Sequence, residues 1–136
     1  MTDQPTKPNE PGRQVGGEHY GGTEWQHWDW VEWNGLGYQE GQISLYVLRW
    51  RKKDGIKDLE KAIHHTEKLM EQYSDPRLMR RNRREYRRER KTAKLFNLMQ
   101  TPAEESLIVL GLLRWLNLSD LQLIRERIIK LKETIT

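Results

Sequence analysis

The sequence predicts an all-α protein, a helical bundle of about five to six helices behind a disordered N-terminal tail. Every proline and most glycines fall at predicted helix boundaries or within the first 55 residues. Between these breaks, apolar residues recur at three- and four-residue steps, the spacing of one helix face. Hydrophobic content of 35% beside 32% charged residues is low for a self-sufficient globule. We therefore expect a partner subunit to complete the core, giving a homo-oligomer.

Length and composition narrow the class of protein. The 136 residues fit a single domain, and the lack of cysteine excludes disulfides and thiolate metal sites. The longest apolar run, residues 107–118, is interrupted by Arg114 and Asn117 and is too short to cross a bilayer. The N-terminus lacks the basic-then-apolar pattern of a signal peptide. The expectation is a soluble cytoplasmic protein without a membrane partner.

The N-terminal segment divides into a tail and a glycine loop. Residues 1–14 hold three of the five prolines and almost nothing apolar, which predicts disorder. The next eight residues contain four glycines, among them Gly16 and Gly17, whose amides could form an anion-binding nest. A flexible loop before the first helix is the alternative. His19 and Tyr20 favour the binding interpretation, because a ring pair inside a glycine loop has little core to join.

Four tryptophans crowd a predicted helix over residues 24–34. On a helical wheel Trp25, Trp30 and Trp33 share a broad face, while Trp28 points away. Burial in the core and in a subunit interface is the expected role. Stacking of one indole on a nucleobase is the alternative, since every base offers a π-face.

Two predicted antiparallel helices, residues 39–53 and 55–73, form the centre of the sequence. A basic corner joins them, and Gly55 is predicted to end the first helix in a left-handed C′ conformation. On the second helix, His64 and His65 point in different directions and lack the i, i+4 partner of a zinc-binding helix. We therefore expect neither histidine to bind a metal.

The corner between these helices gathers charges of both signs around an exposed helix N-terminus. Tyr46, Arg49 and Lys53 lie along one edge of the first helix. Asp54 and Asp58 lie where the second helix begins, close to the positive end of its dipole. This combination indicates a site that handles phosphate groups.

A very basic segment lies in an otherwise acidic chain. Residues 77–94 contain eight Arg, two Lys and two Glu, a local charge of +8, whereas the rest of the chain carries −4. Ser74, Asp75 and Pro76 predict the start of a helix that continues through this segment. A solvated face is the usual meaning of such a run. The alternative is a nucleic-acid partner, because Arg suits bidentate phosphate contacts better than Lys. The arginines that would make these contacts are Arg80, Arg81, Arg83, Arg84, Arg87 and Arg88.

The C-terminal residues 101–136 predict a helical hairpin. Thr101 opens a capping box with Pro102 at the first helical position, and Ser119 opens a second one. A seam with steps of 3, 4, 3 and 4 residues follows, made of Leu121, Ile124, Ile128, Leu131 and Ile135. This seam closes the hairpin or packs against a symmetry mate. We assign the hairpin to oligomerisation.

Part of this pattern resembles a known family. The motif Gly16-Gly17-x-His19-Tyr20 is followed by Gly35-Leu36-Gly37-Tyr38 and Glu40-Gly41, and then by Tyr46, Arg49, Lys53, Gly55, Asp58-Leu59 and Lys61-Ala62. With these motifs, over about residues 15–73, the chain resembles small tailed-phage proteins described as nucleotide kinases, built on a phage domain of otherwise unknown function. Gln42 stands where that family has Asn, and Leu45 where it has Lys. The chain is then divided into a tail (1–14), a nucleotide-kinase-like helical domain (15–73), a basic helix (74–100) and the C-terminal hairpin (101–136).

The resemblance implies a nucleotide as ligand, phosphoryl transfer from a nucleoside triphosphate to a nucleoside monophosphate, and an infected bacterial cytoplasm as location. No G-x-x-x-x-G-K-[ST] loop is present, so other groups must neutralise the phosphates. Catalytic roles fall to His19, Arg49 and Asp58, and Mg²⁺ binding to Asp54 and Asp58. Substrate and phosphate contacts fall to Gly16, Gly17, Tyr20, Tyr46, Lys52, Lys53, Lys57 and Lys61. The alternative is a non-enzymatic accessory protein that sequesters a nucleotide or binds nucleic acid through the Arg-rich segment.

Overall fold

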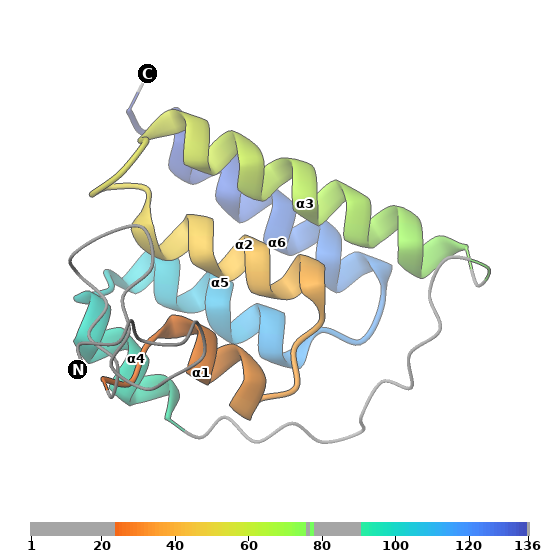
Figure 1. Cartoon of the computed structure of the whole chain (residues 1–136). Helices are drawn as coiled ribbons and strands as arrows, with labels where there is room; N and C mark the ends of the chain where they lie inside the picture. The colour runs from red at the N-terminus through yellow and green to blue at the C-terminus, as the bar shows by residue number, and fades with distance from the viewer. Residues whose placement is uncertain (1–23, 76, 78–90, 136) are drawn as a thin grey trace, which may run out of the picture.

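The computed structural model describes residues 24–75, 77 and 91–135, which form six α-helices and no strand (Figure 1). In chain order the helices are α1 (His27–Trp33), α2 (Tyr38–Arg49), α3 (Ile56–Ser74), α4 (Thr92–Met99), α5 (Ala103–Arg114) and α6 (Leu118–Glu133). The prediction of an all-α bundle is therefore confirmed for this part of the chain. None of these helices is both long and apolar enough to span a membrane.

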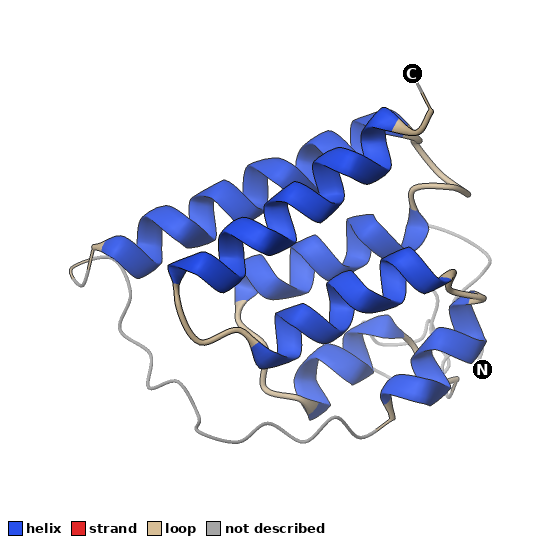
Figure 2. Ribbon diagram, turned by 180° about the vertical axis from the view of Figure 1, so that it is seen from behind, coloured by secondary structure: helices blue, strands red, loops and turns tan. Residues whose placement is uncertain are grey.

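The helices stack in three layers of two (Figure 1 and Figure 2). Helix α3 lies beside α6, α2 lies beside α5, and the short helices α1 and α4 form the third layer. Helix α3 also packs on α2, and α6 on α5, so the four longer helices enclose one core. Its largest fully buried apolar side chains are Trp30, Trp115, Ile43, Leu59, Leu69, Leu95, Ile108, Leu112, Leu121 and Ile128. Burial of each aliphatic side chain contributes roughly 1.5–3 kcal/mol. Because both halves of the chain supply these residues, each half depends on the other for its core.

Helices α2 and α5 repeat one another in sequence at a spacing of 65 residues. Both have 12 residues, and each is followed at its C-cap by a tryptophan, Trp50 or Trp115. Each carries a buried glutamate at its third position, Glu40 or Glu105. The pattern E-x-x-I-x-L-x-x-L-R-W is common to residues 40–50 and 105–115.

The match extends to the neighbouring helices. Helix α4 begins 65 residues after α1. In α3 and α6 the buried positions correspond at a spacing of 62 residues, and they are Leu59, Ala62, Thr66 and Leu69 in α3 and Leu121, Ile124, Ile128 and Leu131 in α6. Asp58 and Asp120 also correspond, and each accepts a hydrogen bond from the amide four residues earlier, at 3.3 Å and 2.8 Å. Residues 24–75 and 91–135 are thus two copies of one three-helix unit.

The two units face each other around an approximate twofold axis. The indole Nε1 of Trp50 donates to Oε2 of Glu105 at 2.8 Å, and Nε1 of Trp115 donates to Oε2 of Glu40 at 2.6 Å. Reciprocal contact between equivalent residues is the property of a twofold interface. The helix pairs α1–α4, α2–α5 and α3–α6 are likewise pairs of equivalent elements. The chain therefore has the arrangement of a dimer joined into one polypeptide.

Two features predicted for the first unit need correction. Helix α2 ends at Arg49 and not at residue 53, because the chain turns back so that the Gly55 amide bonds the Trp50 carbonyl oxygen at 2.9 Å. The positive φ of Gly55 is confirmed at 58°, but Gly55 is the N-cap of α3 rather than the C′ residue of α2. In α1, Trp30 is buried in the core and Trp33 is 47% exposed, so burial of Trp33 in a subunit interface stays a prediction.

The helix predicted over residues 74–100 is not continuous. Helix α4 begins at Thr92, directly after Lys91 in a left-handed conformation with φ of 64°. This conformation cannot extend a right-handed helix. The earlier part of the predicted helix, residues 76 and 78–90, lies outside the described residues.

The capping boxes predicted for the C-terminal hairpin are wrong, although both of its helices are present. Pro102 is the N-cap of α5, and the Thr101 amide instead completes the end of α4 by bonding the carbonyl of Phe96 at 3.0 Å. Helix α6 is capped by Asn117, whose side chain accepts an amide hydrogen bond from the first turn at 3.0 Å, and not by Ser119. Both helices therefore begin at a different residue from the one the capping pattern indicates.

The seam on α6 closes inside the chain. Four of its members are buried where α6 packs on α3 and α5, whereas Ile135 is 46% exposed. Of the two alternatives, the closed hairpin is the one observed. Assembly with a second copy of the chain stays a prediction.

Candidate functional site

Tyr46 lies at the centre of a cluster formed by α2 and α3. The Cζ atom of Arg49 lies 5.0 Å from the centroid of the Tyr46 ring, and Nζ of Lys61 lies 5.5 Å from it. The His65 ring stacks on Tyr46 at 5.8 Å with 17° between the two planes. Cations from two helices thus meet at one aromatic ring, where the ring quadrupole attracts them.

A buried carboxylate holds Arg49 in place. Asp58 is fully buried, and its Oδ2 and Oδ1 accept hydrogen bonds from Nε and Nη2 of Arg49 at 3.3 and 3.4 Å. The Asp54 amide donates a further bond to Oδ2 at 3.3 Å. Asp58 also lies in the first turn of α3, where the helix dipole favours negative charge. The pair fixes the guanidinium and leaves 30% of the Arg49 side chain exposed.

His65 has a defined tautomer in this cluster. Its Nδ1 lies 2.6 Å from Oε1 of Gln39, and because an amide oxygen only accepts, Nδ1 carries the proton. Tyr38 packs edge-on against the ring at 6.0 Å, and the His64 ring adjoins it at 5.9 Å. Burial, and then the neighbouring charge of His64, lower the pKa of His65 below its usual value. At pH 7 His65 is therefore neutral and presents Nε2 as an acceptor.

The structure divides the predicted corner residues into two groups. Tyr46, Arg49, Asp58 and Lys61 belong to the cluster just described. Lys52, Lys53, Asp54 and Lys57 are exposed on the turn and the first turn of α3 beside it. Lys52 contacts the second unit, since its Nζ lies 3.4 Å from Oε1 of Gln100.

The two carboxylates predicted to hold Mg²⁺ differ in availability. Both oxygens of Asp58 already accept hydrogen bonds and the side chain is buried, whereas Asp54 is exposed. Among the described residues, no group of three or more His, Asp or Glu side chains is arranged to hold a metal ion. Proteins commonly bind Mg²⁺ through one or two carboxylates together with substrate phosphates. A magnesium site therefore rests on Asp54 and stays a prediction.

The glycine loop and the arginine set lie outside the described residues. These positions are Gly16, Gly17, His19 and Tyr20 in the loop, and Arg80, Arg81, Arg83, Arg84, Arg87 and Arg88 in the basic segment. Their roles stay predictions.

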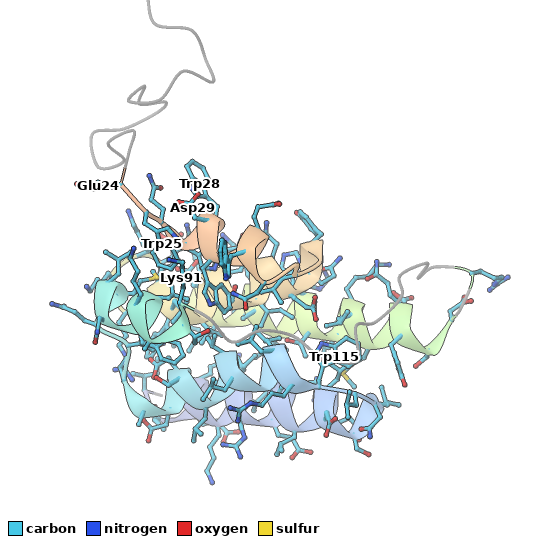
Figure 3. The ribbon with its side chains drawn as sticks, turned by 90° about the horizontal axis from the view of Figure 1, so that it is seen from below. Glu24, Trp25, Trp28, Asp29, Lys91 and Trp115 are labelled. Atoms are coloured by element: carbon cyan, nitrogen blue, oxygen red, sulfur yellow. The ribbon has the colours of Figure 1, made fainter. Side chains whose placement is uncertain are left out.

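The aromatic surface of α1 contacts lysines of the second unit. The Nζ of Lys94 lies 4.8 Å from the ring centroid of Trp25, and Nζ of Lys91 lies 5.4 Å from that of Trp33. Figure 3 shows Trp28 projecting away from the bundle, and its side chain is 64% exposed. Trp25 and Trp33 therefore connect the α1 region to the start of α4, whereas Trp28 does not take part in these two contacts.

Sequence reasoning missed Gln39 and His65 as members of the site. His65 follows Lys61 by one helical turn and so shares its face of α3, while Gln39 precedes Tyr46 by two turns on α2. This spacing was a usable signal, because residues four apart on a helix are surface neighbours. His65 was compared only with a zinc-binding pattern, and that comparison does not consider its spacing from Lys61.

No protein-family model, characterised protein or solved structure matches this chain. The site is therefore interpreted from its own geometry and from the motif resemblance. Of the charged residues in that motif, Arg49 lies on α2 and Asp58 and Lys61 lie on α3, whereas Lys53 lies in the turn between the two helices.

Proposed function

We propose that this protein binds a nucleotide on the face formed by α2 and α3, with the phosphates at Arg49 and Lys61. The observation that carries the proposal is the convergence of these two cations on Tyr46, with the first anchored by buried Asp58. A guanidinium held in one orientation loses little side-chain freedom when it binds phosphate. The phage nucleotide-kinase-like motif contains these same residues, which supports a nucleotide as the anion.

An aromatic surface that can stack on the nucleobase lies beside the proposed phosphate contacts. Tyr38 is 70% exposed and lies 6.0 Å from His65, which in turn stacks on Tyr46. Aromatic rings stack on any nucleobase and contribute about 1–3 kcal/mol per base. Tyr38 and Tyr46 lie about 12 Å apart along the axis of α2. The face thus offers a ring at one end and cations at the other.

Binding, rather than phosphoryl transfer, is the function that the geometry supports best. Transfer depends on metal ions that neutralise the developing charge, and Asp58 is already engaged with Arg49. Gln42 and Leu45, the two departures from the family pattern, lie on α2 within the same unit. A nucleotide-binding accessory protein is therefore the proposal, and nucleoside monophosphate kinase activity is the extension that an assay must decide.

Isothermal titration calorimetry with nucleoside mono- and triphosphates tests the proposal. Lys61→Gln removes one exposed cation and should weaken binding on the order of tenfold, because a charge-assisted contact is lost. Arg125→Gln is the matched control, since it removes a cation that pairs with Glu67 at the α3–α6 contact, and it should bind as wild type does. Equal affinity of Lys61→Gln and wild type contradicts the proposal.

Transfer is tested separately on the wild-type chain. The assay follows conversion of nucleoside monophosphates to diphosphates in the presence of a triphosphate and Mg²⁺. Binding without conversion is the expected result. Sustained Mg²⁺-dependent turnover would instead assign the kinase activity and require a metal ligand such as Asp54.

A further inference from the structure

A pocket lies outside the α2–α3 cluster, lined by the second unit together with Arg51 of the first unit. It has a volume of about 370 Å³ and lies between the start of α5 and the end of α6. This volume falls in the range of small-molecule sites, about 300–1,000 Å³. The lining combines the apolar Ile108 and Leu131 with three cations, Arg51, Arg127 and Lys130, and with one acid, Glu104.

Two of the three cations are available to a ligand. Arg51 is engaged, because its Nε donates to Oε2 of Glu105 at 2.7 Å and its guanidinium lies 4.5 Å from the ring centroid of Trp50. Arg127 and Lys130 form no ion pair with any residue in the described ranges 24–75 and 91–135. Within these described ranges, an anion in the pocket would therefore not have to displace an existing partner from them.

The floor of the pocket is part of the protein core. Ile108 is 1% exposed and Leu131 is 5% exposed. Both positions belong to the buried set that recurs in the two units, so the floor is held by packing. Because Ile108 and Leu131 are almost fully covered already, a ligand with an apolar body makes most of its apolar contact with the aliphatic stems of Arg127 and Lys130, which line the same pocket. An inorganic anion has no apolar group to make this contact.

The internal repeat relates this pocket to the first unit. Glu104 corresponds to Gln39 in the α2–α5 alignment, and Arg127 corresponds to His65 in the α3–α6 alignment. In the first unit Gln39 and His65 are bonded to each other at 2.6 Å. In the second unit the equivalent residues line an open pocket. The repeat thus carries a closed polar contact in one copy and an accessible site in the other.

We propose that this pocket binds a phosphate monoester that carries a small apolar body. Arg127 presents a fork of donors that suits bidentate phosphate contact, and Lys130 adds a second positive charge three residues along α6. The body of the ligand lies against the aliphatic stems of these two cations, above Ile108 and Leu131 at the floor. Glu104 faces the same space and opposes the phosphate charge, so its carboxylate limits the affinity. The inference does not depend on nucleotide binding at the α2–α3 cluster, because the two sites share no residue.

Titration with phenyl phosphate, followed by methyl NMR of Ile108 and Leu131 in the full chain, tests the inference. The methyl signals should shift saturably. Inorganic phosphate and phenol each lack half of the ligand and should bind at least tenfold more weakly than phenyl phosphate, since each loses one set of contacts. Ring signals of Tyr46 in the same sample report the α2–α3 cluster, so failure at one site is distinguishable from failure at the other.

Substitutions of the charged residues in the pocket test which side chains contact the phosphate. Arg127→Gln and Lys130→Gln should each weaken phenyl phosphate binding roughly tenfold, the loss of one charge-assisted contact. Arg125→Gln, on the same helix but paired with Glu67, should leave it unchanged. Glu104→Gln should tighten it, because the opposing charge is gone. Absence of saturable shifts, unchanged affinity in both cation variants, or phenol binding as tightly as phenyl phosphate would each overturn the inference.

Discussion

The indole of Trp115 donates a hydrogen bond of 2.6 Å to Oε2 of Glu40, and both side chains are buried. The bond joins the end of α5 to the first turn of α2. Trp50 and Glu105 repeat it at the opposite ends of the same two helices. A buried carboxylate costs free energy unless it is hydrogen-bonded. Each tryptophan therefore donates to a buried acid of the other unit, and the pair of bonds fixes how the two units pack.

Replacement of either tryptophan tests this role. Trp50→Phe and Trp115→Phe keep most of the apolar surface but remove the donor, so each should lower the free energy of unfolding by about 1–3 kcal/mol. Urea denaturation measures the change. Trp28→Phe, at a side chain that is 64% exposed, is the control and should change stability by less than about 0.5 kcal/mol. If the three variants unfold at the same urea concentration, the reciprocal bonds do not stabilise the fold.

His27 should make stability depend on pH. Its Nε2 lies 2.8 Å from Oγ of Ser44, and burial lowers the pKa of His27 from 6.5 to about 4. Between pH 6.5 and pH 4, His27 binds a proton in the unfolded chain but stays neutral in the folded protein, so protonation of His27 favours unfolding. The contribution of neutral His27 to the free energy of unfolding is fully present above pH 6.5. It is lost as the pH falls toward 4, and the total loss is about 3 kcal/mol.

The measurement for His27 is the free energy of unfolding at pH 7.5 and pH 4.5. His27→Gln has no imidazole to protonate and should lose less stability than wild type between these two values. Carboxylates titrate in both proteins, so the difference between their pH profiles isolates His27. Parallel profiles would mean that His27 is protonated in the folded protein as readily as in the unfolded chain.

Much of the fold could be predicted from the sequence because its signals are local. The apolar spacing of α3 and α6 and the breaks at glycine and proline identified the long helices. Helix ends could not be predicted as well. Ser119 and Asn117 are both good capping residues, and the one whose side chain reaches the first-turn amide is decided by the path of the preceding loop.

The internal repeat was also present in the sequence. Leu48-Arg49-Trp50 recurs as Leu113-Arg114-Trp115, and the same spacing of Glu and Ile precedes each tripeptide. The repeat is obscured because many exposed positions differ between the two units, and some buried ones differ as well, such as Thr66 and Ile128. Tyr46 of the cluster corresponds to Gly111, and Lys61 corresponds to Leu123. Only the pairing of helices in space makes the equivalence plain.

The candidate site was predicted as a set of residues but not as an arrangement. Arg49 and Asp58 were both assigned catalytic roles, and Asp58 a metal-binding role as well, but their contact with each other as an ion pair was not predicted. That contact depends on the rotation of α2 against α3, which the glycine turn between them sets. The spacing of nine residues across a turn does not determine it.

Gly55 should tolerate substitution poorly for a backbone reason. Its φ is 58°, and a Cβ built there meets nothing within 4 Å, so any cost comes from conformation alone. Gly55→Ala should lower the free energy of unfolding by about 1–3 kcal/mol. Gly41 is the matched control, because it lies inside α2 with ordinary contact to Val31 at 3.4 Å. Gly41→Ala should be neutral or stabilising by up to about 1 kcal/mol, since Ala favours a helix over Gly. Equal effects in urea denaturation would contradict the assignment.

Asp58→Asn separates a positioning role from a metal role. Asp58 accepts both contacts from Arg49, at 3.3 and 3.4 Å. Asparagine keeps the shape but has no charge and a single acceptor atom, so Arg49 should lose its fixed orientation. We therefore expect nucleotide affinity to fall roughly tenfold even without Mg²⁺. Calorimetry with a nucleoside triphosphate, once in EDTA and once in Mg²⁺, measures the effect, and circular dichroism checks that the variant is folded.

The two roles of Asp58 predict different results in the metal-free sample. If Asp58 held Mg²⁺, removal of its charge from the phosphate site would leave metal-free binding unchanged or tighter, and affinity would fall only when Mg²⁺ is present. A positioning role predicts a similar loss in both samples, because Arg49 contacts the phosphate whether or not a metal is bound. Asp54→Asn is the control, since Asp54 is exposed and its side chain is not the one that holds Arg49. Asp54→Asn should change nucleotide affinity only in the sample that contains Mg²⁺. If Asp58→Asn binds the nucleotide in EDTA with wild-type affinity, the positioning role is refuted. Asp58 would then be assigned to Mg²⁺ binding.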